Sequence, residues 1–256
     1  MDYAPLTLVA VAAVSLAAGA FGGMLGVGGG IVLVPVMVGL LGIPLEEARS
    51  ASLVSVIVTS LGASLVYLKD GVTDLERAGP LQLPTVVGAV VGAHLGMVLN
   101  GRIVATLFSI LIFIVSWQML VQRGSGTPRK VPGSTWMWAG FACVFGGILS
   151  SLLGVGGGLI FVPVMALLFG SEQRVASATS AFLIGMTAAS SALIYQMSGH
   201  LHPWLGVSSA GGIFLGAQVG ARVSGMLSGR RLRVIFSFVM IATAFLLLNR
   251  VVRGDV

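Results

Sequence analysis

The chain has 256 residues, of which 56% are hydrophobic and 9% are charged, and its formal net charge is +6. An ordinary soluble domain carries about 25% charged residues, so this composition excludes a water-exposed surface over most of the molecule. The basic residues lie between apolar runs, where positive charge sets the orientation of membrane helices, and this placement argues against nucleic-acid binding.

Apolar runs of helical length follow one another along the chain. They cover residues 5–23, 53–68, 80–99, 103–119 and 136–153. A helix of about 20 apolar residues crosses a hydrocarbon core of about 30 Å. We therefore predict an all-α polytopic membrane protein in a lipid bilayer, and we expect the first run to be a retained helix because no small-residue cleavage signal follows it.

The first uncharged stretch, residues 5–43, is too long for one membrane helix. At 1.5 Å per residue it would span about 60 Å. Glycine disfavours helix by up to ~1 kcal/mol relative to alanine and permits positive φ angles. We predict a helix, a glycine turn and a second helix, which Pro35 weakens. The glycines of this turn are Gly26, Gly28, Gly29 and Gly30.

The chain repeats itself after 128 residues. The segment GVGGGIVLVPVM at 26–37 returns as GVGGGLIFVPVM at 154–165. The same shift pairs Ser52 with Ser180, Thr59 with Thr187 and Tyr67 with Tyr195, and a shift of 124 pairs Gly88, Gly92, Ala93 and Gly96 with Gly212, Gly216, Ala217 and Gly220. We predict a first membrane repeat at 1–121, a linker at 122–135 and a second membrane repeat at 136–256.

The number of membrane segments in each repeat determines the topology. Four spans per repeat divide the basic residues evenly and make the repeats parallel, which is the outcome if the glycine segment is a re-entrant turn. Five segments leave only Arg49, Arg102, Arg250 and Arg253 on one side, which agrees better with the positive-inside rule. An odd number also inverts the second repeat, so we favour inverted repeats with both termini outside.

The glycine turns are candidates for anion binding. Exposed backbone N–H groups in a turn that leads into a helix N-terminus can surround an anion. The alternative is that small residues only let helices pack closely. A nucleotide-binding loop is excluded because Ile31 and Leu159 follow the last glycines. The candidate residues are Gly28, Gly29, Gly30, Gly156, Gly157 and Gly158.

Hydroxyl side chains follow each glycine turn, and several of them recur at helical spacing. They are neutral hydrogen-bond donors that could face one pocket. The alternative is that each hydroxyl bonds to another helix or to the carbonyl four residues earlier in its own helix. The candidates are Ser52, Ser55, Thr59, Thr179, Ser180 and Thr187.

Ionisable groups inside membrane spans are costly and therefore indicate function. The deepest by sequence are His94 and Arg222. His94 aligns with Gln218, and Arg222 lies one helical turn beyond Gln218. Arg222 could pair with a sulfonate or sulfite, and His94 could carry a coupling proton. The alternatives are snorkelling for Arg222 and helix packing for His94.

No motif of a membrane enzyme is found in the spans: a protease Gly-x-Ser-Gly, a zinc His-Glu-x-x-His and an acidic pair are all missing. His200 and His202 lack a third ligand nearby, so we expect no metal site. We predict a protein that is not an enzyme and carries no cofactor.

The chain resembles the TauE/SafE sulfite exporters, also called TSUP permeases, over almost its whole length. The resemblance rests on the doubled Gly-x-Gly-Gly-Gly-x-x-x-x-Pro at 26–35 and 154–163. It also rests on the Ala-x-x-Thr-Ser-like element, intact at 176–180 and altered at 48–52, and on the Gly-Ala-x-x-Gly elements. The resemblance implies a permease of the bacterial cytoplasmic membrane for sulfite, thiosulfate, sulfoacetate or another organosulfonate, driven by an ion gradient.

Together these features predict a secondary transporter that works by alternating access around a midplane site at the repeat interface. Its partners would be a small anion, the bilayer and a coupling proton or sodium ion. The alternatives are a passive anion channel and a transporter of a non-sulfur carboxylate anion.

Overall fold

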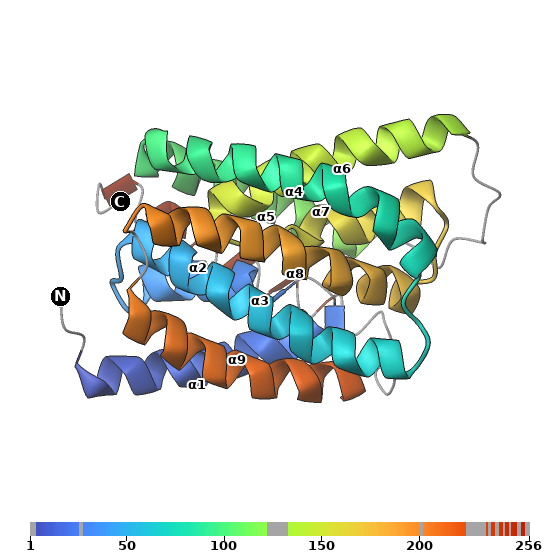
Figure 1. Ribbon diagram of the computed structural model, residues 1–256. Helices are drawn as coiled ribbons and strands as arrows, with labels where there is room; N and C mark the ends of the chain where they lie inside the picture. The colour runs from blue at the N-terminus through green and yellow to red at the C-terminus, as the bar shows by residue number, and fades with distance from the viewer. Residues whose placement is uncertain are drawn as a thin grey trace.

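The computed structural model describes residues 4–25, 28–121, 133–199 and 202–223, with isolated positions between 234 and 253. Within these ranges the chain is built from helices joined by short connections (Figure 1). They are α1 (Pro5–Leu25), α2 (Gly30–Gly39), α3 (Leu45–Lys69), α4 (Leu75–Val98), α5 (Gly101–Val121), α6 (Gly133–Leu153), α7 (Gly158–Pro163), η1 (Val164–Leu168), α8 (Gln173–Met197) and α9 (Pro203–Val223).

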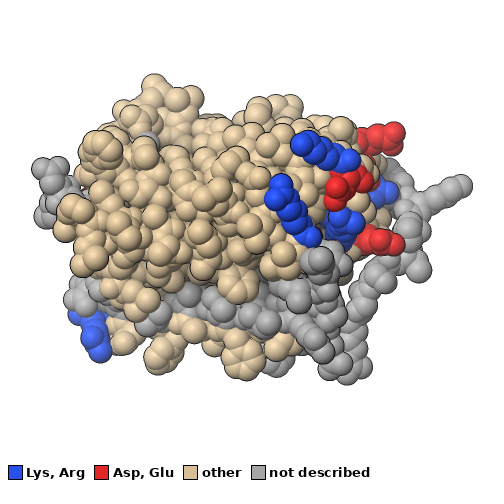
Figure 2. Space-filling view, turned by 90° about the horizontal axis from the view of Figure 1, so that it is seen from below, with Lys and Arg blue, Asp and Glu red and all other residues tan. Residues whose placement is uncertain are grey.

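Five helices in the described part of the chain are long and apolar enough to cross a membrane. The surface seen in Figure 2 is free of charge over most of its length. The acidic and most of the basic side chains lie at one end, and a basic side chain lies at the other end. The prediction of a polytopic helical membrane protein is confirmed. The spans are Pro5–Met24, Leu45–Lys69, Leu75–Val98, Thr135–Leu153 and Gln173–Met197.

The predicted helix, glycine turn and second helix occur in both halves. A β-carbon added to Gly29 would lie 3.1 Å from the carbonyl oxygen of Ala18, so α2 begins beside the middle of α1 and folds back along it. Pro35 lies inside α2. Pro163 ends α7, and a single π-helical segment, η1, follows. Proline lacks the N–H that would continue the α-helical pattern, which explains the change at this residue.

Two closely packed helix pairs, α1 with α9 and α4 with α6, each join one half of the chain to the other. Gly212 and Gly216 of α9 pack directly against the backbone of α1 at Ala12 and Leu16. In the same way, α4 uses Gly88 and Gly92 to reach the α6 backbone at Val144 and Ile148. Small residues allow membrane helices to approach this closely. Glycines that are equivalent under the 124-residue shift therefore make equivalent helix contacts in the two halves.

Helices α3 and α8 lie between these two pairs and pack against each other. Ser60 of α3 donates to the carbonyl of Ala181 in α8 at 2.6 Å. In Figure 1, α1 and α6 run in opposite directions, and so do α3 and α8. This arrangement is compatible with inverted repeats, which stay a prediction.

The predicted division into two membrane repeats and a linker stays a prediction. Helix α6 begins at Gly133, within the predicted linker. Residues 122–132 lie outside the described part of the chain, as do Gly26 and His200.

Candidate functional site

The two glycine turns meet at the centre of the molecule. A β-carbon added to Gly30 would lie 2.9 Å from the carbonyl oxygen of Gly154. Gly28 and Gly156 both face the same two side chains, Val56 of α3 and Ile184 of α8. Because Val56 and Ile184 are themselves 128 residues apart, this contact joins equivalent parts of the two halves.

Each turn uses backbone conformations that favour glycine. Gly28 and Gly29 have φ angles of 84° and 50°, and Gly156 and Gly157 have φ angles of 89° and 76°. A side chain in this left-handed region is strained, whereas glycine adopts it freely. Gly29 and Gly157 directly precede the first residues of α2 and α7. The first N–H groups of both helices, which lack acceptors within their own helix, therefore lie beside the contact between the turns.

Ser52 links α3 to the second turn. Its buried hydroxyl donates to the carbonyl of Gly154 at 2.6 Å. A β-carbon on Gly30 would lie 2.5 Å from the same hydroxyl, so Ser52 contacts both turns. Ser180, its equivalent in α8, is also buried. Among the predicted hydroxyl residues, Ser52 therefore lies at both turns.

The threonines that follow bond within their own helices. Thr59 donates to the carbonyl of Ser55 at 2.8 Å, and Thr187 donates to the carbonyl of Leu183 at 2.9 Å. This is the alternative that the sequence left open for these hydroxyls. The Ser55 hydroxyl differs from them, because it is buried and has no hydrogen-bond partner among the described residues.

Thr179 faces a different part of the molecule. Its hydroxyl oxygen accepts from the backbone N–H of Asp74 at 3.1 Å. Asp74 caps the N-terminus of α4 by accepting from the N–H of Arg77. This contact directs the Thr179 hydroxyl to the connection between α3 and α4, and the structure does not bring it to the glycine turns.

The structure does not bury the two ionisable candidates. His94 is exposed, and its Nδ1 lies 2.8 Å from the carbonyl oxygen of Val90 in the same helix. Arg222 is also exposed, near the end of α9, while Gln218 is half-buried. Helix α9 packs its glycine face on α1, whereas Arg222 lies on an exposed part of the helix.

Arg49 is instead the buried arginine, with 1% of its surface exposed. The topology prediction counts Arg49 among the basic residues on one side of the membrane, and in the structure it lies in the second turn of α3. Its Nη1 donates to the carbonyl of Leu152 at 3.0 Å, and both terminal nitrogens lie 3.4 Å from the carbonyl oxygen of Gly96. The guanidinium carbon lies 5.8 Å from the ring centre of Tyr195. A signal was present: the repeat pairs Arg49 with Ser177, so the arginine departs from the internal symmetry.

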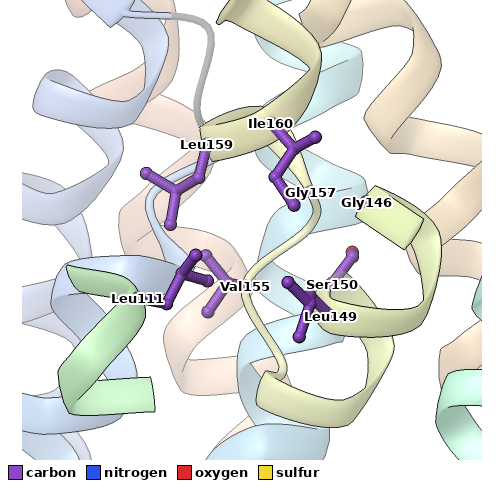
Figure 3. A pocket seen from close by; sticks show the side chains of 8 residues that line it. All are labelled: Leu111, Gly146, Leu149, Ser150, Val155, Gly157, Leu159 and Ile160. Atoms are coloured by element: carbon purple, nitrogen blue, oxygen red, sulfur yellow. The ribbon is translucent and has the colours of Figure 1, made fainter. Parts of the chain in front are cut away.

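A small pocket lies beside the second turn (Figure 3). Its wall carries one polar side chain, Ser150, whose buried hydroxyl has no hydrogen-bond partner among the described residues. The pocket is next to the turn but is mainly hydrocarbon. Its lining residues are Leu111, Gly146, Leu149, Ser150, Val155, Gly157, Leu159 and Ile160.

Known proteins are similar in sequence to this chain over most of its length. The probable membrane transporter protein YunE of Bacillus subtilis (strain 168) is 25% identical over 260 residues, covering 92% of this chain and 95% of the relative. A probable membrane transporter protein of Haemophilus influenzae (strain ATCC 51907 / DSM 11121 / KW20 / Rd) is 27% identical over 226 residues, covering 83% of each chain. No solved structure matches this chain.

The comparison with protein families agrees with these relatives. The family described as sulfite exporter TauE/SafE matches residues 11–247, which include both glycine turns and the helices around them. The resemblance stated from the glycine motifs is therefore confirmed, and the chain belongs to the sulfite exporter TauE/SafE family of membrane transporters.

Proposed function

We propose that this protein is a secondary transporter of the bacterial cytoplasmic membrane that moves a small sulfur-containing anion by alternating access. Sulfite, thiosulfate, sulfoacetate and other organosulfonates are the candidate substrates, and a proton or sodium gradient supplies the energy. The observation that carries the proposal is the central contact of the two glycine turns, one from each half, between Val56 and Ile184.

This contact has the features that an anion carrier needs. The carbonyls of Gly28, Gly29 and Gly157 already accept from several N–H groups at the starts of α2 and α7. The backbone N–H groups of Ile31, Gly158 and Leu159 have no acceptor among the described residues and are the donors left for an anion. The two turns belong to different halves, so a movement of one half relative to the other would open the contact. Non-helical backbone at this depth survives because the protein buries it.

The test is uptake of radiolabelled sulfite and thiosulfate into proteoliposomes containing the Gly156→Ala variant. A β-carbon at this position would collide with Val56, and its φ angle is 89°. We expect the variant to insert normally and to lose most uptake. The matched control is Gly71→Ala. Gly71 has a similar φ of 65°, but a β-carbon added there would have no neighbouring atom within 4 Å.

Wild-type protein that transports neither anion would refute the assigned substrate class. Flux that does not saturate with substrate and shows no exchange of labelled anion would identify a channel instead. Normal uptake by a folded Gly156→Ala variant would show that the glycine contact does not take part in transport.

A further inference from the structure

The guanidinium of Arg49 is a buried positive charge without a negative partner. Its side chain is 1% exposed, and no carboxylate among the described residues lies within ion-pair distance of it. Removing a cation from water is costly unless negative charge and hydrogen bonds compensate. Glu46, one helical turn earlier, is exposed, and no ion pair in the described part of the chain includes Arg49, so the buried charge indicates an external counter-ion.

The present partners of Arg49 are neutral. The carbonyls of Leu152 and Gly96 lie in the last turns of α6 and α4, where the helix dipole presents partial negative charge. The Tyr195 ring adds a weak attraction at 5.8 Å. The remaining donor, Nε, has no partner within the described ranges. One donor of the guanidinium thus has no acceptor in the described part of the chain, and only neutral groups contact the charge.

The fold closes at the equivalent place without a cation. Position 177, the equivalent of Arg49, is serine. The equivalent tyrosines make similar contacts in both halves: Tyr67 donates to the carbonyl of Gly23 at 2.8 Å, and Tyr195 donates to the carbonyl of Ser151 at 3.4 Å. Because the same scaffold packs with a serine at position 177, helix packing alone does not explain the arginine.

The backbone of Arg49 packs directly against the second glycine turn at Gly154. A β-carbon added to Gly154 would lie 2.8 Å from the α-carbon of Arg49. The pocket on the other side of this turn offers an anion only the hydroxyl of Ser150. The α3 side therefore has the positive charge, while the α5 side has hydrocarbon.

We propose that Arg49 binds the negatively charged end of the transported anion on the α3 side of the second glycine turn, an inference that rests on the proposed function. The planar guanidinium, with Nε and a terminal nitrogen as parallel donors, matches two oxygens carried on one atom. Sulfite, sulfonates and carboxylates share this chemistry. Binding through Nε and Nη2 replaces the 3.4 Å contact between Nη2 and the carbonyl of Gly96 by a bond to a charged oxygen, while Nη1 keeps its bond to the carbonyl of Leu152.

The experiment measures equilibrium binding of radiolabelled sulfite, thiosulfate and acetate, each in a separate titration, to the full-length protein in lipid nanodiscs. The test variant is Arg49→Gln. The control is Arg102→Gln, which removes an exposed arginine from the first turn of α5 and changes the net charge equally. We expect Arg49→Gln to raise Kd about tenfold or more, since a charge-assisted bond is lost, and Arg102→Gln to change it less than about twofold.

A monodisperse, helical Arg49→Gln protein with the wild-type Kd would overturn the assignment. If that variant does not fold, Arg49→Lys decides, because lysine keeps the charge but lacks Nε and the planar fork. A several-fold weaker affinity supports the proposal, and an unchanged affinity overturns it.

The wild-type measurements separate this inference from the proposed function. If the wild type binds none of the three anions, the proposed function fails and the inference fails with it. If it binds acetate but neither sulfur anion, and Arg49→Gln loses acetate binding, the role of Arg49 stands and the sulfur substrate is wrong.

Discussion

Ser52 shows how a single hydroxyl can hold the central contact together. It donates to the carbonyl of Gly154, which lies 102 residues away in the other half of the chain. Both groups are buried, so neither would recover a bond to water if the other were removed. Thr59 and Thr187 have the same chemistry but bond to their own helices, so they contribute less to the joining of the halves.

Replacing Ser52 by alanine removes the donor to Gly154. We expect the free energy of unfolding to fall by roughly 1–3 kcal/mol, because a buried carbonyl loses its partner. Thermal unfolding in detergent measures the change. The control is Ser198→Ala, whose exposed hydroxyl bonds only to the carbonyl of Ile194, and equal effects from the two variants would contradict this role for Ser52.

At the scale of the helix, glycine has two uses in this molecule. In the turns it permits left-handed backbone, and in α4 and α9 it permits direct contact with a neighbouring helix. Helix α4 contains a crowded glycine and an uncrowded one. A β-carbon added to Gly92 would collide with the carbonyl of Ile148, whereas a β-carbon added to Gly79 would have no neighbouring atom within 4 Å. Position along one helix therefore decides whether a methyl group is tolerated.

Gly92→Ala should separate α4 from α6. We expect the variant to lose about 1–3 kcal/mol of stability, because the added methyl group overpacks a close contact. Gly79→Ala should change the stability by less than about 1 kcal/mol, because Pro80 opposes the helix preference of the added alanine. Unfolding of the two purified variants in the same detergent measures both effects, and a Gly92→Ala protein as stable as Gly79→Ala would show that α4 and α6 move apart without loss.

The whole molecule is tied at one end by contacts between its halves. Arg174 at the start of α8 pairs with Asp70 at the end of α3 at 2.6 Å, and Arg77 donates to Ser171 at 3.0 Å. Most of the charged side chains seen in Figure 2 lie at one end of the molecule. The Asp70–Arg174 pair is about half exposed, so its contribution to stability is small, on the order of 0.2–1 kcal/mol. The pair joins α3 of the first half to α8 of the second half at this end of the molecule.

Joining Asp70 and Arg174 covalently should test whether the halves must separate there. Cysteines at both positions, in a background in which the buried Cys143 is replaced by serine, can be linked by a short disulfide-containing reagent. We expect the link to stop uptake into proteoliposomes and reductant to restore it, because alternating access requires each end to open in turn. Each single cysteine serves as control, and unchanged flux through the linked protein would contradict alternating access.

Much of the architecture follows from patterns along the chain. The apolar runs predict α1, α3, α4 and α6, and the doubled glycine segment predicts the turns before α2 and α7, because membrane helices must satisfy their backbone locally. Local hydrogen bonding makes such elements readable without knowledge of the fold. The pairing of Gly88 and Gly92 with Gly212 and Gly216 likewise indicated two equivalent surfaces.

The sequence by itself determined the helical membrane class, the duplication and the glycine turns, since each depends on residues close together in the chain. Tertiary structure alone decided which polar groups are buried. It placed Arg49 inside and left His94 and Arg222 exposed, because burial depends on which face of a helix meets its neighbours. That face is set by contacts such as Gly154 with Arg49, which are more than 100 residues apart in the chain and which hydropathy along one helix does not record.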